Sequence, residues 1–342
     1  MTNYWPEGWL VNTAQNHSFC QNISGLREAL HSQTILEARA CVCTPEHDLV
    51  VDFGFCKGKI PRCEGAVGIS DGTTRDIALL SRVNKPVCFV VQSIEQNPDG
   101  SFTPILSRRL AQQRCLEESI RHLHAGDIIP ARVTHLEAFG CFVDIGCGIP
   151  SLIPIDCISV SRISHPSDRF RTGQDIYAVV TDVDQNLRVS LSHKELLGTW
   201  EENAALFSSG ETVSGIVRSV EHYGVFVELA PNLAGLAEPK DGVKVGQQAS
   251  VYIKNLIPEK MKIKLIIIDS FDPPCDVPAP ITPLRYFIDS GHLDHWVYSP
   301  AVSNKKIETS FSRKQKRNLC GSSFLFCVNR SGLRIRPLSP LR

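Results

Sequence analysis

The 342-residue sequence lacks several features that define whole classes of protein. It has no run of about 18 uncharged apolar residues, so we expect no membrane-spanning helix and no membrane partner. Residues 1–8 lack the basic-then-apolar order of a secretion signal, which favours a cytoplasmic location. The 13 cysteines are odd in number and include no C-x-x-C pair, so reduced thiols are expected and a metal site is not.

Patterns that support catalysis are missing as well. We find no glycine-rich phosphate loop, no H-E-x-x-H and no G-x-S-x-G in a supporting context. His292, Asp294 and His295 look like a ligand set, but no further ligand follows at a usual spacing, so a structural role is preferred. The sequence therefore predicts no catalytic residue, no cofactor and no enzyme.

The net charge is zero, but the charges are distributed unevenly. Residues 312–342 carry eight of the 36 Lys and Arg and no acid, so residues 1–311 hold 28 basic against 36 acidic side chains. A protein that binds nucleic acid mainly through phosphates would be basic throughout. If RNA binds, base stacking must contribute more than bulk charge. The basic end is predicted to be a disordered tail, which fits either RNA contact or a shifted reading frame.

A repeat with a constant offset of 84 residues is the main positive signal. Residues 126–154 align with residues 210–238. The matched positions are Val133 with Val217, Phe139-Gly140 with Tyr223-Gly224, Phe142-Val143 with Phe226-Val227, Asp144 with Glu228, and Leu152 with Leu236. Alternating apolar residues predict half-buried strands, and five short strands in about 70 residues fit a closed oligonucleotide-binding (OB) type barrel.

A third, degenerate copy is predicted upstream. Residues 104–109 occupy the position that residues 189–194 have at the end of the second unit, and strand patterns precede them in matching order, without the aromatic-glycine element. The predicted domains are an N-terminal segment 1–33, a degenerate barrel 34–113, a barrel 124–196, a shortened barrel 208–269, a Pro-rich linker with a small C-terminal segment 270–311, and the tail 312–342.

Two linker helices are predicted between the units. The first follows Ser107, with an apolar face of Leu110, Leu116, Ile120 and Leu123. The second follows Ser192, and its apolar residues recur every four positions at Leu196, Trp200 and Ala204.

Several segments together resemble the S1 RNA-binding domain family. In the second unit these are residues 138–144, the loop 151–154, the Gly173 turn and residues 188–192, and in the third unit residues 222–228 and 233–237. The whole chain resembles the ribosomal protein S1 family. This resemblance implies an all-β fold of tandem five-stranded OB-type (S1) barrels joined by short helices. It also implies binding of single-stranded RNA (mRNA), a role in translation, and the small ribosomal subunit as a partner.

The sequence departs from the family pattern in two places. Members commonly have a histidine just after the Gly-Leu turn, where this chain has Pro154 and Glu238, so one RNA contact is missing. The third unit is also eleven residues shorter between Pro239 and Gly246. Weaker RNA binding, or its partial replacement by protein contacts, is expected.

The predicted RNA-binding residues are of three kinds. Aromatic rings could stack on bases: Phe139 and Phe142 in the second unit, Tyr223 and Phe226 in the third. The alternative is that one ring of each pair fills the barrel, because the paired positions differ in strand parity unless a bulge lies at the glycine between them. The basic candidates are Arg132, Arg188, Lys194, Arg218 and Lys262, which could equally be solvated surface residues; the resemblance singles out Arg188. His135 and His222 could contact bases or simply lie on the surface.

These features fit three functions to different degrees. A non-enzymatic RNA-binding protein is the leading hypothesis. A protein-interaction adaptor on the ribosome or another RNA machine, with weak RNA affinity, is the alternative that the acidic body favours. An RNA-processing enzyme has the least support, because no segment outside the barrels carries a recognisable site.

Overall fold

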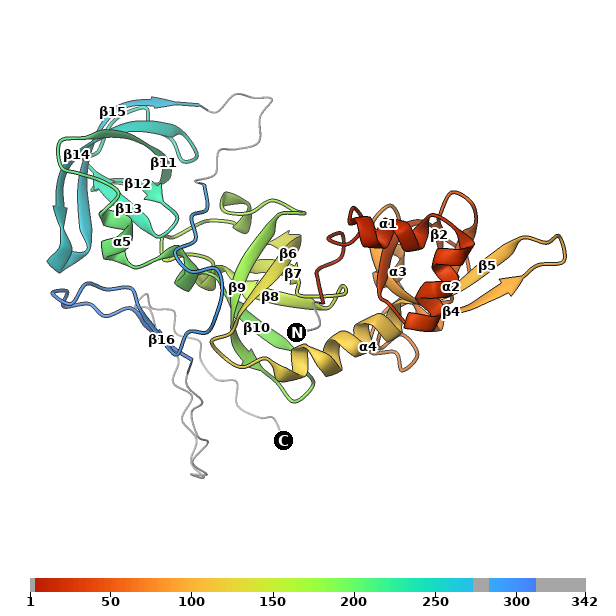
Figure 1. Ribbon diagram of the computed structural model, residues 1–342. Helices are drawn as coiled ribbons and strands as arrows, with labels where there is room; N and C mark the ends of the chain where they lie inside the picture. Colours follow the sequence, from red (N-terminus) through yellow and green to blue (C-terminus); the bar gives the residue numbers. More distant parts are fainter. Residues whose placement is uncertain (1–3, 273–282, 312–342) are drawn as a thin grey trace, which may run out of the picture. The chain divides into compact units, whose positions relative to one another are not determined.

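The computed structural model describes residues 4–272 and 283–311 (Figure 1). It contains three closed five-stranded barrels, which confirms the predicted fold class. The predicted tail 312–342 and the prolines of the linker at residues 273–282 lie outside the described residues.

Each barrel uses five consecutive strands. The first comprises β1 (Leu36–Cys43), β2 (Leu49–Asp52), β3 (Lys57–Ile60), β4 (Pro86–Gln96) and β5 (Phe102–Ser107). The second comprises β6 (Ile128–Glu137), β7 (Gly140–Asp144), β8 (Pro150–Pro154), β9 (Asp175–Val183) and β10 (Val189–Ser192). The third comprises β11 (Thr212–Glu221), β12 (Gly224–Ala230), β13 (Leu233–Ala237), β14 (Gln248–Ile257) and β15 (Lys262–Phe271).

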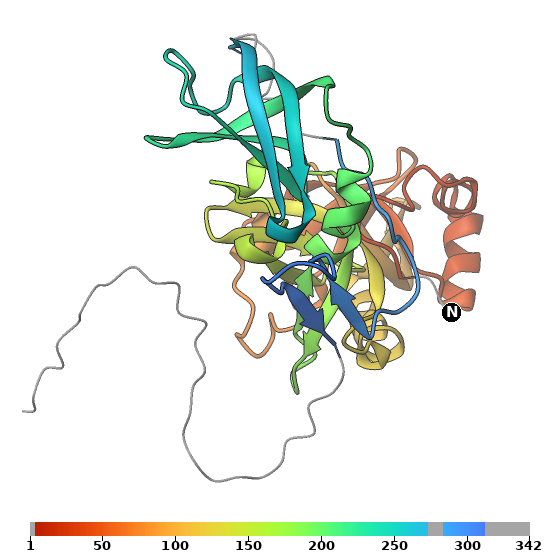
Figure 2. The ribbon, with the colours of Figure 1, turned by 90° about the vertical axis from the view of Figure 1, so that its left-hand side faces the viewer.

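The three barrels share one topology. The first three strands form an antiparallel meander, the fourth pairs with both the first and the fifth, and the third and fifth close the barrel as a parallel pair. The first strand of each barrel has a register shift at the same point, between Ala40 and Val42, Val133 and His135, or Val217 and Ser219. A bulge bends and twists a strand, which allows so short a sheet to close. Figure 2 shows the long β14 and β15 strands of the third barrel in blue-green.

The N-terminal segment forms two helices, α1 (Ala14–Cys20) and α2 (Ile23–Ser32). Asn22 begins α2 because its side chain accepts a hydrogen bond from the backbone N–H of Gly25. Leu26 and Ala29 of α2 are fully buried and join the core of the first barrel, together with Phe89 and Leu106. This segment is therefore part of the first folded unit.

The first linker helix, α4 (Arg108–Glu118), forms after Ser107, which caps it by accepting from the N–H of Leu110. Its buried residues are Arg108, Ala111, Gln112 and Cys115. The predicted apolar face is confirmed only in part: Leu116 and Leu123 pack against the core of the second barrel and Ile120 is buried, but Leu110 is only partly buried. The buried face of the helix is mixed, because Ala111 and Cys115 join the core while Arg108 pairs with a buried carboxylate of the N-terminal segment.

The second linker divides into a 3-10 turn at Lys194–Leu197 and the helix α5 (Trp200–Ala204), with Gly198 at a positive φ of 81° between them. Thr199 and Glu202 form a capping box that begins α5. Leu196, Trp200 and Ala204 are all buried, as the spacing predicted.

Residues 283–311 pack against the second and third barrels. A short hairpin of β16 (His295–Val297) and β17 (Glu308–Ser310) places Trp296 in the core of the third barrel, beside Tyr298. Tyr286 packs edge-on against His193, at the end of the second barrel. The described part of the predicted C-terminal segment is therefore packed against both barrels, with Trp296, Tyr298 and Phe311 buried.

All of the cysteines in the described residues are free thiols. Four of them are buried: Cys88, Cys115, Cys141 and Cys147. Within residues 4–272 and 283–311, no helix is long and apolar enough to cross a membrane. The same residues contain no cluster of three or more side chains suited to holding a metal ion.

Candidate nucleic-acid interface

Phe139 and Phe142 form an aromatic pair on the outside of the second barrel. Phe139 lies in the turn between β6 and β7 with 56% of its surface exposed, and Phe142 follows in β7. Their ring centroids are 5.9 Å apart in an edge-to-face arrangement. Cys141 and Val143, the neighbours of Phe142, point into the core, so Phe142 points outward. Neither phenylalanine fills the barrel, and both rings offer surface for stacking.

Both rings lie on the outside of the barrel, but not because of a bulge at Gly140, the explanation that the sequence offered. The bulge is not at Gly140 but on the opposing strand, where Val133 and His135 both pair around Thr134. Phe139 precedes strand β7 and sits in the turn, so strand parity does not govern its direction. Gly140 is required for another reason: a Cβ there would lie 2.6 Å from the carbonyl oxygen of Ile153 in β8.

The third barrel repeats this arrangement at the 84-residue offset. Tyr223 lies in the β11–β12 turn and is 54% exposed, and its ring centroid is 6.2 Å from that of Phe226 in β12. His222 adds a third ring, 5.0 Å from Tyr223 and edge-on to it. A Cβ on Gly224 would lie 2.5 Å from the carbonyl oxygen of Ala237, so this glycine has the same role as Gly140.

Three of the predicted basic residues remain available to phosphates. Arg188 is exposed in the turn between β9 and β10, and Lys262 is exposed at the start of β15. Lys194 is partly exposed and its ammonium donates only to the backbone oxygen of Asp156, 3.3 Å away. No ion pair involves any of the three within the described part of the chain. Their charges are therefore not neutralised by the protein.

The other two predicted basic residues are used inside the protein. Arg132 forms a two-pronged ion pair with Asp175, at 2.6 and 2.9 Å, and also donates to the backbone oxygen of Glu7. Arg218 pairs with Glu228 and Asp168 and is only 10% exposed. The predicted phosphate contacts of Arg132 and Arg218 are therefore not expected, because carboxylates of the protein already pair with both guanidinium groups. His135 stays exposed, but its Nε2 is 2.7 Å from a carboxylate oxygen of Glu137.

Two buried ion-pair clusters connect the barrels, and sequence reasoning missed both. At the first, Glu7 accepts from Arg108 at 2.7 and 3.1 Å and from Arg82 at 3.1 Å, while its own N–H donates to Asp144. Burial alone would raise the pKa of Glu7, but the pairing with Arg108 outweighs it and the pKa lies below its usual value. Asp144 has no such partner, so burial and the nearby Glu7 charge raise its pKa to about 7.

The second cluster lies between the second and third barrels. Arg169 is fully buried and forms a two-pronged pair with Glu228, at 2.8 and 2.9 Å. Arg218 binds the same carboxylate from the other side at 3.0 and 3.1 Å. Burial by itself raises the pKa of Glu228, and the two guanidinium groups lower it below its usual value. Glu228 occupies the repeat position of Asp144. At this position each barrel binds a residue from the preceding part of the chain: Asp144 accepts a hydrogen bond from Glu7, and Glu228 pairs with Arg169.

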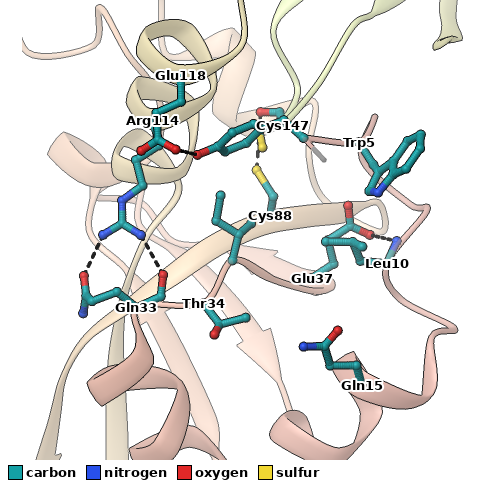
Figure 3. Close-up of a pocket in the computed structure, with 12 residues that line it drawn as sticks. Trp5, Leu10, Gln15, Gln33, Thr34, Glu37, Cys88, Arg114, Glu118 and Cys147 are labelled. Carbon is teal, nitrogen blue, oxygen red and sulfur yellow. Dashed lines mark hydrogen bonds between the residues drawn. The ribbon is translucent and has the colours of Figure 1, made fainter. Parts of the chain in front are cut away.

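A cavity of about 600 Å³ lies among the N-terminal segment, the first barrel and α4 (Figure 3). Arg114 donates to the backbone and side-chain oxygens of Gln33, and Tyr4 donates to Glu118. The buried carboxylate of Glu37 accepts three backbone N–H groups at Oε2, while Oε1 has no partner. Burial raises the pKa of Glu37 to about 7. None of the predicted RNA-binding residues lines this cavity.

The chain contains closed barrels in which the third and fifth strands form a parallel pair. Two of these barrels bear exposed aromatic rings at the same repeat position. These features define a tandem OB-type barrel protein.

Comparison with known proteins narrows this class. Residues 122–194 match the model of the S1 RNA binding domain family. The small ribosomal subunit protein bS1 of Staphylococcus aureus (strain COL) is 28% identical over 264 residues, which cover 72% of this chain and 64% of that protein. The bS1 protein of Staphylococcus haemolyticus is 30% identical over 261 residues, or 71% of this chain and 63% of that one.

The chain is thus similar to the small ribosomal subunit protein bS1 over most of its length, and its second barrel matches the S1 RNA binding domain model. It spans slightly less than two thirds of the length of these relatives. Among solved structures, a multidomain protein with nucleic acid binding domains from Streptococcus pneumoniae aligns over 69% of this chain and 74% of its own, at 14% identity and a TM-score of 0.24.

Proposed function

We propose that this chain binds single-stranded RNA, including mRNA, without catalysing a reaction, and that it does so in translation on the small ribosomal subunit in the cytoplasm. The observation that supports this most is the pair of exposed rings, Phe139 with Phe142, on the barrel that matches the S1 RNA binding domain model. Relatives similar over most of this chain are named as small ribosomal subunit proteins, which supports the proposed partner.

The proposed mode of binding follows from the exposed aromatic rings and from the basic side chains that form no ion pair among the described residues. Aromatic rings stack on any base and contribute about 1–3 kcal/mol each, so binding should show little sequence preference. Arg188 and Lys194 of the second barrel and Lys262 of the third supply phosphate contacts, and His135 and His222 are further candidates beside the rings. We propose residues 124–196 as the primary RNA-binding domain, residues 208–269 as a weaker one, and residues 34–113 as a barrel that supports them.

A binding titration with a single-stranded RNA of about 12 nucleotides tests the stacking surface. Phe139→Ala and Tyr223→Ala each remove one exposed ring, and loss of 1–3 kcal/mol corresponds to about a 5- to 150-fold weaker Kd. Phe55→Ala is a matched control, because Phe55 is 44% exposed on the first barrel, away from both aromatic pairs. Unchanged affinity in both ring variants would exclude the stacking surface and leave the protein-interaction adaptor as the better explanation.

A further inference from the structure

The second and third barrels enclose a pocket of about 440 Å³ at their junction, which we call the junction pocket. Arg162, Ile163 and Ser164 line it from the β8–β9 loop of the second barrel. Tyr223 and Phe226, the aromatic pair of the third barrel, line the other side. The remaining lining residues are Arg218, Ser219, Glu221 and Ala234. The aromatic surface of the third barrel is therefore not open on all sides, as a single isolated barrel would leave it.

The loop that carries Arg162 is held firmly against the third barrel. Arg169, at its far end, is fully buried in its pair with Glu228 and also donates to the backbone oxygen of Pro231. At its near end, the N–H of Val160 donates to the side chain of Asn232, at 2.9 Å. With both ends tied to the third barrel, the pocket is formed before any ligand arrives, which reduces the entropy lost on binding.

Arg162 differs from the other arginine of this pocket. The guanidinium of Arg218 is neutralised by Glu228 and Asp168. Arg162 is exposed, and no hydrogen bond or ion pair to it occurs within residues 4–272 and 283–311. It is thus a cation, free of ion pairs among the described residues, that lines the same pocket as the two aromatic rings. The exposed carboxylate of Glu221 and the hydroxyls of Ser164 and Ser219 line this pocket as well and offer hydrogen-bond partners.

This combination matches the chemistry of one nucleotide. Aromatic faces stack on a base, a guanidinium pairs with a phosphate, and a carboxylate accepts from base N–H groups. A volume of about 440 Å³ is within the range of small-ligand pockets, roughly 300–1,000 Å³. We propose that the junction pocket binds a single nucleotide of the RNA strand, with Arg162 of the second barrel acting in the binding site of the third. This proposal rests on the RNA-binding function proposed above and assigns a residue that the repeat alone does not reveal.

The test uses the full chain carrying Phe139→Ala, so that RNA affinity depends more on the third barrel. In this background Arg162→Gln should weaken binding of a single-stranded RNA about tenfold, the effect of one lost charge-assisted contact. Arg121→Gln is the matched control, because Arg121 is also exposed but lies on the linker before the second barrel. It should change the affinity less than twofold.

A double-mutant comparison separates the pocket from general charge attraction. If Arg162 and Tyr223 hold the same nucleotide, Arg162→Gln should have less than a twofold effect once Tyr223→Ala is present, because coupled residues are non-additive. Equal effects of Arg162→Gln and Arg121→Gln, or full additivity with Tyr223→Ala, would overturn the junction pocket while leaving the proposed function intact. Failure of the proposed function looks different: neither Phe139→Ala nor Tyr223→Ala would then weaken binding.

Discussion

At the scale of single residues, the same side-chain type serves opposite purposes. Arg188 lies in the turn between β9 and β10, and Arg218 lies within β11. Nothing local in the sequence separates them. The structure does: Arg188 projects into solvent, whereas Arg218 is held between two carboxylates. Buried ion pairs connect residues far apart in the chain; Arg169 and Glu228 are separated by 59 positions. No periodic pattern in the sequence therefore predicts them.

The protonation of His193 is coupled to folding. It is fully buried, and its Nδ1 donates to the backbone oxygen of Ile158 while Nε2 accepts from the hydroxyl of Tyr286. Burial lowers the pKa of His193 from 6.5 to about 4, with a smaller contribution from the charge of Arg169. The imidazole of His193 therefore binds a proton more readily in the unfolded chain than in the folded chain.

The expected result is that His193 becomes destabilising in acid. Because its pKa is lowered in the folded state, this side chain binds fewer protons in the folded chain than in the unfolded chain between pH 6.5 and 4, so its contribution to the free energy of unfolding falls by roughly 3 kcal/mol as the pH drops through this window. The raised pKa values of Glu37 and Asp144 act in the opposite direction in both proteins, so the test is the difference between wild type and His193→Gln. In urea unfolding at several pH values, the wild type should lose stability relative to His193→Gln as the pH falls. The same slope in both proteins would contradict the assignment.

At the scale of elements, the repeat explains which features of the fold could be predicted from the sequence. The aromatic-glycine segments and the alternating strands repeat at an offset of 84, so both the fold class and the exposed rings could be found from the sequence. The face of α4 could not, because α4 buries Arg108 against Glu7, which is 101 residues away. Likewise the N-terminal segment looks merely polar, yet its Glu7 lies between the first two barrels and its helices complete the first core.

Removing the charge of Glu7 should therefore weaken the connection between the first and second barrels. Glu7→Gln leaves the guanidinium of Arg108, only 4% exposed, without its counter-charge. Breaking a buried pair in this way typically costs about 3–5 kcal/mol, measurable as a lower urea midpoint. Glu118→Gln is the control, because Glu118 lies at the surface and bonds only Tyr4, and its loss should cost less than about 1 kcal/mol. Equal effects of the two changes would show that Glu7 is not an anchor.

At the scale of the whole molecule, the three barrels have one topology but unequal surfaces. The second has a complete aromatic pair, a free Arg188 and the long β8–β9 loop. The third has its own aromatic pair, and the loop of the second barrel encloses it. The first has no aromatic pair in the β1–β2 turn, and α1, α2 and α4 pack against it instead. We therefore expect RNA binding to be concentrated in residues 124–269.

Photo-crosslinking of a single-stranded RNA carrying 4-thiouridine to the full chain, followed by mapping of the crosslinked residues, tests the central claim most directly. Because a stacked base lies against the ring that holds it, crosslinks are predicted at residues 139–142 first and at residues 223–226 second. Crosslinks confined to the first barrel or to residues 312–342, with none on either aromatic pair, would contradict the account.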